Sequence, residues 1–158
     1  MQNRTLEAVL KIAAWQIGVM EFPAGSNKVK YCDEYGTVGG MKAYPWCVAF
    51  VWWVFREAGF NLFKTASCGE LYNKYKKDAP AQIVRGNYRP GDLVFFDFSG
   101  KRLKKEHIGI VEAVKGNTLI TIEGNTGTTN DANGGAVMRR TRELNKVTCG
   151  IRPNYPDA

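Results

Sequence analysis

The sequence predicts an α+β fold, in which N-terminal helices pack on a C-terminal antiparallel sheet. Before Pro80, apolar residues recur at the spacing of amphipathic helices. After Pro80, short runs rich in β-branched residues alternate with turn signals such as Arg89-Pro90-Gly91-Asp92. Helices followed by strands are typical of the α+β class. A chain of 158 residues with 44% apolar and 12% aromatic content can bury one sizeable core, so we expect a single domain over residues 1–158.

Four helical segments are predicted in the first half. Thr5 is a suitable N-cap for the first, and Gly36 ends the short second one. The third segment is apolar on nearly every side, which indicates a central, buried helix. Pro45 suits its first turn and Gly59 the position just past its end. The predicted helices are Leu6–Met20, Asn27–Tyr35, Tyr44–Gly59 and Ser67–Lys77.

The second half contains short strands separated by turns. Gly116-Asn117 separates two runs rich in β-branched residues, which predicts a hairpin. The Gly, Asn and Thr content of Thr126–Gly135 indicates a loop. The predicted strands are Leu93–Phe96, His107–Val114, Thr118–Ile122, Val137–Thr141 and Val147–Ile151.

The chain is basic, with 22 Lys and Arg against 15 Asp and Glu and a formal net charge of +7. This balance favours an anionic partner: a nucleic acid, a membrane surface or a polyanionic cell wall. The densest cluster, Lys101–Lys105, falls in an expected loop, and the other basic residues are scattered. A nucleic-acid-binding domain is an alternative, but a clustered Arg/Lys face and a known recognition module are missing. No window reaches the ~18 consecutive apolar residues of a membrane span. We therefore expect neither nucleic acid nor a membrane as partner.

Four cysteines and a single histidine limit the chemistry of the chain. The cysteines are Cys32, Cys47, Cys68 and Cys149, and four cysteines allow two disulfides in three pairings. No Cys-x-x-Cys or Cys-x-x-His spacing occurs, so a zinc site is not expected. Any reaction that needs an imidazole has to use His107.

Cys47 and His107 together suggest a nucleophile and its base. A lone cysteine is more often a buried structural residue, and a lone histidine has usually no catalytic role. Cys47, however, falls in the first turn of the expected apolar helix, where unpaired backbone N–H groups favour the thiolate. His107 begins a strand that would pack beside this helix. A Cys–His pair is the minimum for acyl transfer, because the imidazole removes the thiol proton and later protonates the leaving amine.

A catalytic histidine needs a group that orients its ring, and Glu123 and Asn125 are the two candidates. A two-residue turn at Gly116-Asn117 would pair residues whose numbers sum to 233, so that His107 would share its face with Gly124 and not with Glu123. A three-residue loop, Lys115-Gly116-Asn117 with a bulge, would place His107 opposite Asn125 and diagonal to Glu123. Only the second register assembles a triad, so we predict the three-residue loop.

Four segments now stand in a suggestive order along the chain: YPWCVAF at 44–50, RPGDLVFF at 89–96, HIGIV at 107–111 and EGNT at 123–126. In this order and at this spacing they resemble the CHAP domain, the cysteine, histidine-dependent amidohydrolase/peptidase group of the NlpC/P60 superfamily. The resemblance covers nearly the whole chain. It implies a papain-like α+β core that hydrolyses peptide or amide bonds of bacterial peptidoglycan, as in the catalytic parts of phage endolysins and bacterial autolysins.

The resemblance also implies roles for individual residues. Cys47 would be the nucleophile and His107 the general base and acid. Glu123 would orient the imidazole, and Asn125 would support that arrangement or the site. The Cys47 backbone N–H would contribute to the oxyanion hole, for which some members add a tyrosine hydroxyl.

Several aromatic residues are candidates for the oxyanion hole or the substrate groove. Tyr35, which precedes the nucleophile by 12 positions, is the first candidate for the hydroxyl donor, and Tyr44 is the second. Trp46 is a candidate for contact with the substrate. Trp52 and Trp53 are expected in the core.

Some phage members of the family hold calcium with an Asp-x-Asp loop just before the nucleophile. Residues 37–46 contain no Asp or Glu here, whereas calcium needs several oxygen ligands. We therefore predict no metal and no cofactor.

The implied function is a peptidoglycan hydrolase with a Cys-His-Glu mechanism. We favour an N-acetylmuramoyl-L-alanine amidase, with an endopeptidase of the stem or cross-bridge as the alternative. A non-catalytic wall-binding module of the same fold is disfavoured, because every proposed catalytic position is occupied. The positive charge would suit anionic wall polymers such as teichoic acids.

The expected location follows from the N-terminal pattern and the resemblance. Glu7, Lys11 and Gln16 interrupt the first apolar segment, so no signal peptide is expected. A phage lysin would be made in the host cytoplasm and released to the wall, and a bacterial enzyme would be extracellular by other means. Because a cytoplasm is reducing, we expect free thiols. Endolysins commonly carry a C-terminal wall-binding domain, so the chain is expected as a catalytic domain, either alone or excised from such an enzyme.

Overall fold

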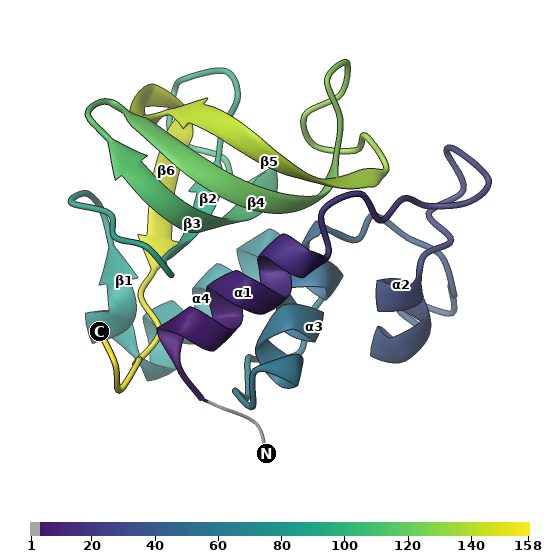
Figure 1. Ribbon diagram of the computed structural model, residues 1–158, viewed down its shortest axis with the longest axis horizontal. Helices are drawn as coiled ribbons and strands as arrows, with labels where there is room; N and C mark the ends of the chain where they lie inside the picture. The colour runs from purple at the N-terminus through teal and green to yellow at the C-terminus, as the bar shows by residue number, and fades with distance from the viewer. Residues whose placement is uncertain (1–3) are drawn as a thin grey trace.

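The computed structural model describes residues 4–158, which form helices and one antiparallel sheet (Figure 1). Residues 1–3, on which the signal-peptide expectation partly depends, lie outside the described residues. The α-helices are α1 Leu6–Trp15, α2 Lys30–Tyr35, α3 Cys47–Glu57 and α4 Cys68–Asp78. The strands are β1 Ile83–Val84, β2 Leu93–Phe96, β3 His107–Lys115, β4 Thr118–Thr126, β5 Ala136–Glu143 and β6 Val147–Ile151. Helices first and strands afterwards confirm the predicted α+β class.

The strands lie in the order β1-β6-β2-β3-β4-β5, and all neighbours are antiparallel. Helices α1 and α3 pack on the same face of the sheet (Figure 1). On that face Ile108, Ile110 and Ile122 join the main core. Phe96 and Val111 belong to a second cluster on the opposite face. Side chains alternate between the faces along a strand. Glu123, the neighbour of Ile122, therefore lies on the face away from α3.

Helix α3 is central and buried, as predicted, but it begins three residues later than the expected Tyr44. Trp46 has φ −122° and is the N-cap, so Pro45 stays outside the helix and Cys47 becomes its first residue. At the other end Gly59 has φ +87°, the left-handed conformation that a glycine adopts readily after a helix. The third predicted helix is thus confirmed, and its start corrects the prediction for Pro45.

Helix α1 is shorter than predicted, because its chain leaves the helix to pair with the sheet. Thr5 caps the helix by accepting a hydrogen bond from the Ala8 N–H. The helix ends at Trp15, and Gly18 has φ +101°, which a helix does not allow. The N–H of Gly18 then donates to the carbonyl of Val137, and the isolated bridge of Met20 to Ala136 continues this contact. An apolar periodicity alone does not distinguish such an extended edge from a last helical turn.

The hairpin of β3 and β4 corrects the predicted loop. Lys115 pairs directly with Thr118, so the turn has two residues, with φ +59° at Gly116. The pairing shifts by one residue between Val111 and Ala113, where Glu112 forms a β-bulge. The register near His107 is therefore the one that the triad requires. The extra residue that produces it lies inside the strand and not in the turn.

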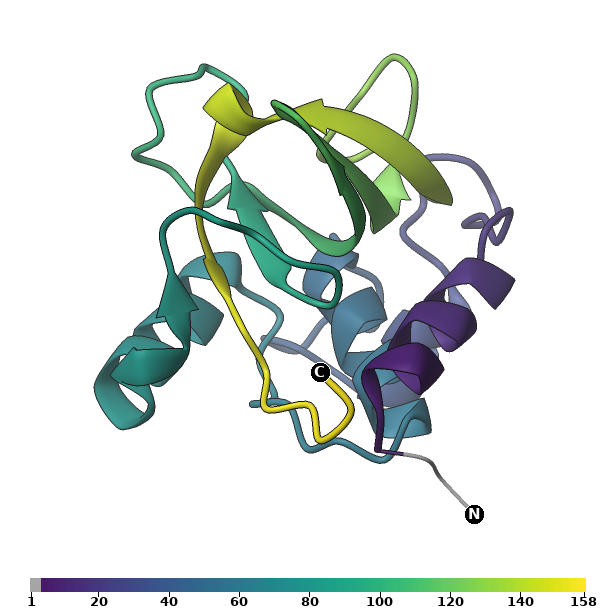
Figure 2. The same cartoon turned by 60° about the vertical axis from the view of Figure 1, so that its left-hand side comes forward.

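The two ends of the described chain meet. Figure 2 shows the segment after β6 running back toward the start of α1. There the Asp157 carboxylate accepts hydrogen bonds from the backbone N–H groups of Leu6 (2.7 Å) and Glu7 (3.2 Å). Carboxylates at a helix N-terminus are stabilising, so the C-terminal segment helps to hold α1.

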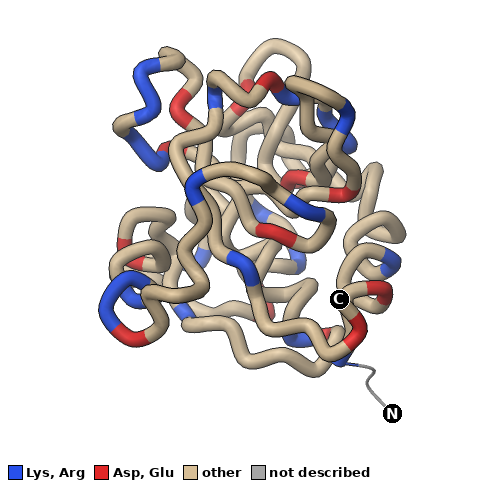
Figure 3. The backbone as a smooth tube through the Cα atoms, turned by 90° about the vertical axis from the view of Figure 1, so that its left-hand side faces the viewer, with Lys and Arg blue, Asp and Glu red and all other residues tan. Residues whose placement is uncertain are grey.

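The charge is distributed along the chain rather than gathered. Figure 3 shows Lys and Arg on helices, strands and loops in this view. Within residues 4–158 no helix has the length and apolar character needed to cross a membrane.

Candidate active site

His107 is the first residue of β3, and it is fully buried. Its Nε2 atom lies 2.9 Å from Oε1 of Glu123 on the neighbouring strand β4. An ionised carboxylate can only accept hydrogen bonds, so Nε2 donates its proton to Glu123. In the neutral ring Nδ1 then keeps its lone pair. The sequence prediction that Glu123 stands beside His107 agrees with this geometry.

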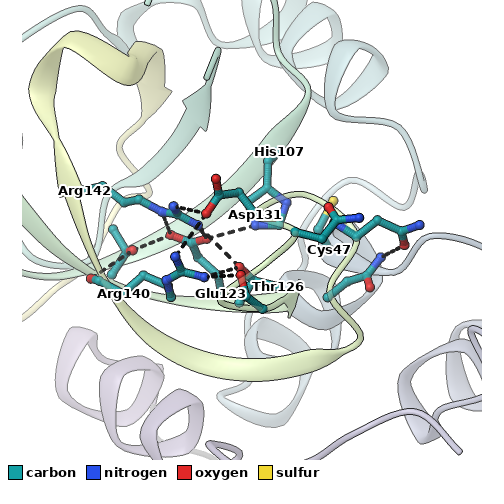
Figure 4. A network of polar contacts seen from close by, with 12 residues as sticks. Cys47, His107, Glu123, Thr126, Asp131, Arg140 and Arg142 are labelled. Atoms are coloured by element: carbon teal, nitrogen blue, oxygen red, sulfur yellow. Dashed lines mark hydrogen bonds and ion pairs between the residues drawn. The ribbon is translucent and has the colours of Figure 1, made fainter. Parts of the chain in front are cut away.

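The free nitrogen of the ring, Nδ1, lies on the side of Cys47 (Figure 4). It is buried and has no hydrogen-bond partner among the described residues. Buried polar atoms without a partner are uncommon in folded proteins. Its position beside a thiol is that of a base held ready for a proton.

The Glu123 carboxylate is held from several sides. Oε1 accepts from His107 and from Nη2 of Arg142 at 2.6 Å. Oε2 accepts from Nε of Arg142 at 2.9 Å and from the Thr121 hydroxyl at 2.5 Å. A carboxylate has about four acceptor positions, and these four hydrogen bonds fill them. Glu123 therefore has one orientation, which fixes the His107 ring.

Arg142 is a site residue that the sequence analysis missed. It lies on β5 with its side chain only 7% exposed, and it also binds Asp131 at 2.7 Å (Figure 4). Its guanidinium stacks 4.8 Å from the centre of the Phe98 ring. Arg140 and Arg142 are two residues apart on β5, so their side chains share one face of the sheet, and this spacing was the signal in the sequence. The register that places this face beside Glu123 could not be predicted, because a long loop separates β4 from β5.

Burial and hydrogen bonding shift the pKa values of Glu123 and His107 in opposite directions, and their balance sets the charge of each group. Burial raises the pKa of Glu123, but the hydrogen bonds from Arg142 and His107 outweigh burial and lower it to about 2. Burial lowers the pKa of His107, but the interactions with Cys47 and Glu123 outweigh it and raise the pKa to about 9. At neutral pH the site therefore favours a carboxylate beside an imidazolium.

Cys47 has the features of a reactive thiol. The hydrogen bond with Cys68 lowers its pKa most, burial opposes this, and His107 and the Val48 backbone N–H lower it further. The result is a pKa well below the usual value. Its place as the first residue of α3 exposes the sulfur to backbone N–H groups of the first turn. The helix and the two strands thus bring Cys47, His107 and Glu123 into one cluster.

Two glycines allow these elements to approach. A Cβ on Gly124 would lie 2.5 Å from Cβ of Phe50, so α3 can sit on β4 only because that position lacks a side chain. A Cβ on Gly109 would lie 2.8 Å from Cγ of Glu123. Gly109 therefore leaves the space in which the Glu123 side chain reaches His107.

Asn125 is fully buried, but its amide serves the loop that follows β4. Its Nδ2 donates to Asn133 at 2.9 Å, and its Oδ1 accepts from the Gly135 N–H at 3.0 Å. Within residues 4–158 it has no hydrogen bond to His107 or Cys47. It therefore supports the site through the loop.

The aromatic candidates divide into two groups. The Tyr44 hydroxyl donates to the carbonyl of Gly36 at 2.6 Å, and Trp46 is fully buried and donates to Glu21 at 3.4 Å. Both are occupied within the core. The Tyr35 hydroxyl has no hydrogen-bond partner in the described part of the chain, while its ring packs against Trp52 at 5.1 Å. Trp53 is buried as expected, and Trp52 is only half-buried.

Among the described residues no group of three or more His, Cys, Asp or Glu side chains is placed to hold a metal ion. The independence from calcium stays a prediction. All four cysteines are free thiols, as expected.

This arrangement can perform acyl transfer. A thiolate beside an imidazolium can attack a carbonyl carbon, and the ring can then protonate the leaving group. The carboxylate keeps the ring in the tautomer and orientation that this transfer requires.

The comparisons with known proteins agree with the geometry. The family model of the CHAP domain matches residues 39–125, a segment that includes Cys47, His107, Glu123 and Asn125. Arg142 lies outside the matched segment. No curated protein sequence matches the chain.

Solved structures share the fold. The chain superposes on the wild-type endolysin LysIME-EF1 with a TM-score of 0.60, at 17% identity over 99% of this chain and 66% of that one. It superposes on Ly7917 with a TM-score of 0.55, at 19% identity over 94% of this chain and 62% of that one. A second Ly7917 structure, with the hydrolysing product of MDP, gives 0.51 at 18% identity, over 94% and 63%. This chain thus spans less than two thirds of the length of each.

Proposed function

Because this chain belongs to the CHAP domain family, we propose that it is a cysteine-dependent peptidoglycan hydrolase that cleaves an amide bond of the bacterial cell wall. The main support is the buried cluster of Cys47, His107 and Glu123, in which the thiol has a lowered pKa and the ring is fixed by a carboxylate. The structural likeness to an endolysin is consistent with the proposal at the level of the fold.

In the proposed reaction the Cys47 thiolate attacks the carbonyl carbon of the scissile amide. The imidazolium of His107 gives its proton to the leaving amine, and a thioester remains on Cys47. Water then attacks the thioester, His107 takes a proton from that water, and the thiolate returns. Glu123 stays ionised throughout and holds the ring.

The negative oxygen of the tetrahedral intermediate needs hydrogen-bond donors. We assign one to the Cys47 backbone N–H, at the start of α3, and a second to the Tyr35 hydroxyl, which no described residue engages. Tyr44 and Trp46 are not assigned, because their polar atoms already bind Gly36 and Glu21.

The bond we propose first is the amide between N-acetylmuramic acid and L-alanine, and a peptide bond of the stem or cross-bridge is the alternative. Mass spectrometry of digested walls separates them. Free stem peptides that begin with L-alanine indicate the amidase, whereas cut cross-links that stay attached to glycan indicate the endopeptidase.

Wall lysis by wild type and Cys47→Ala tests the function itself. We expect the variant to lose lysis and to keep the fold, as judged by circular dichroism. Cys149→Ala removes another buried thiol, outside the cluster, and is expected to lyse walls like wild type. Equal lysis by wild type and Cys47→Ala would contradict the proposal and favour a wall-binding module.

A further inference from the structure

A second cysteine lies beside Cys47, and the proposed hydrolysis does not use it. The Sγ atoms of Cys47 and Cys68 are 4.0 Å apart, and both side chains are buried. Cys68 is the first residue of α4, as Cys47 is of α3. Two helix N-termini therefore converge on one pair of sulfur atoms.

The other two cysteines are engaged elsewhere. The Cys32 thiol donates to the carbonyl of Tyr44 at 3.5 Å, and Cys149 is buried in β6. All four cysteines fall within the described residues, and there Cys47 and Cys68 form the one contact between thiols.

We propose that Cys47 and Cys68 form a peroxide-sensitive dithiol site, which a disulfide closes and a thiol reductant reopens. The sulfur atoms have to approach from 4.0 Å to the ~2.05 Å of a disulfide bond. A rotamer change at a cysteine moves its sulfur by a comparable distance.

The protonation of the pair suits this reaction. The interaction with Cys47, together with burial, holds the pKa of Cys68 well above its usual value. The pKa of Cys47 is lowered by the same contact and by His107. One thiolate and one thiol thus stand side by side, which supplies a group that attacks an oxidant and a group that resolves the product.

The chemistry balances in two steps. The Cys47 thiolate attacks one oxygen of hydrogen peroxide, so that an S–O bond forms, the O–O bond breaks and hydroxide leaves, taking a proton from the His107 imidazolium to become water. The Cys68 sulfur then attacks the Cys47 sulfur; the S–S bond forms, the S–O bond breaks, and the Cys68 proton leaves with the hydroxyl as a second water. Two sulfur atoms are oxidised by one equivalent each, and the peroxide is reduced to water.

The oxidised protein has no thiolate at Cys47, so it should not lyse walls. This consequence depends on the proposed function. The formation of the disulfide does not, because it follows from the thiol contact alone.

The test treats the reduced full chain with hydrogen peroxide and measures intact mass, peptide linkage and wall lysis. We expect the mass to fall by two hydrogen atoms, a linked peptide pair carrying Cys47 and Cys68, and a roughly tenfold or larger loss of lysis that dithiothreitol restores. Cys32→Ser is the matched control and should form the same link.

In Cys68→Ser the resolving thiol is absent, so excess peroxide should carry Cys47 past the sulfenic acid, which dithiothreitol reduces, to the sulfinic or sulfonic acid. The lost lysis, relative to the untreated variant, should then not return with dithiothreitol. Oxygen gain without a link in wild type would overturn the proposal, and so would full recovery of Cys68→Ser. The wild-type peptide map decides the matter if that variant does not fold. A link that leaves lysis intact would support the dithiol site and overturn the proposed role of Cys47.

Discussion

Glu123 accepts hydrogen bonds at all of its acceptor positions, and half of them come from Arg142. Arg142→Met would leave a buried carboxylate with only His107 and Thr121 as partners. Removing one member of a buried ion pair costs about 3–5 kcal/mol, so we expect a loss of that order in the free energy of unfolding, together with slower lysis. Chemical denaturation measures the first effect.

Arg140→Met is the matched control for this change. Arg140 binds the half-exposed Asp131 at 3.0 Å and does not touch Glu123. Arg140 also donates to the Gly127 carbonyl at 2.7 Å and to the Thr126 hydroxyl at 3.1 Å. A partly exposed ion pair contributes about 0–1 kcal/mol, so Arg140→Met should lower the free energy of unfolding by less than Arg142→Met. Equal destabilisation by both variants would contradict the special role of Arg142.

The pKa values at the site predict a bell-shaped pH profile. The pKa of Cys47 is lowered, and that of His107 is raised to about 9. We expect kcat/KM to rise as Cys47 loses its proton and to fall as pH passes about 9, where the ring loses the proton that the leaving amine needs. Glu123→Gln removes a group that raises the His107 pKa, so its alkaline limb should move to lower pH. Alkylation of Cys47 by iodoacetamide needs no proton donor, so it reports the acidic limb alone. An alkaline limb of kcat/KM that does not move in Glu123→Gln would count against the Glu123 assignment.

Tyr35 offers a test of the oxyanion hole. One preorganised donor contributes roughly 3 kcal/mol to the barrier, so Tyr35→Phe should slow lysis about a hundredfold. Tyr44→Phe loses a hydroxyl that binds a backbone carbonyl. It should reduce stability more than rate. An unchanged rate in Tyr35→Phe would remove Tyr35 from the proposed mechanism.

Among the elements, the bulge in β3 sets the register of the site. If Glu112 were paired in a regular ladder from the two-residue turn, His107 would lie opposite Thr126 and would share its face with Gly124 instead of Glu123. Deletion of Glu112 removes only the unpaired residue, so Val111 should still pair with Thr121 and His107 should keep its place beside Glu123. We therefore expect the deletion variant to keep most of its lysis, as should Glu112→Ala, although both lose the ion pair with Arg139. Loss of lysis in the deletion variant but not in Glu112→Ala would refute the register argument.

For the whole molecule, the net charge of +7 predicts a salt effect. A polyanionic wall attracts a basic protein most at low ionic strength, and screening shortens this attraction to about 10 Å at 0.1 M salt. Lysis of intact walls should therefore fall with added salt, while cleavage of a small uncharged fragment should not. If lysis of walls did not change with ionic strength, the net charge would have no part in the function.

Most elements could be predicted because their signals are local. The apolar run of α3 and the β-branched runs of β3 and β4 depend on neighbouring residues only. The end of α1 and the two-residue strand β1 could not, because both exist through pairing with distant strands. The bulge at Glu112 was placed in the wrong part of the hairpin for the same reason: no local residue pattern distinguishes an extra residue in the turn from one inside the strand.

The sequence by itself determined the chemistry available to this protein: one imidazole, a thiol at the start of an apolar helix, and an acid on the next strand. Only the tertiary structure decided how these groups are held. Arg142, Cys68 and the bulge make contacts between residues that are far apart in the sequence, whereas periodicity and capping report on near neighbours only. Hydrogen bonds and packing between distant segments form only in the folded chain. The orientation of Glu123 and the neighbour of Cys47 are therefore properties of the fold.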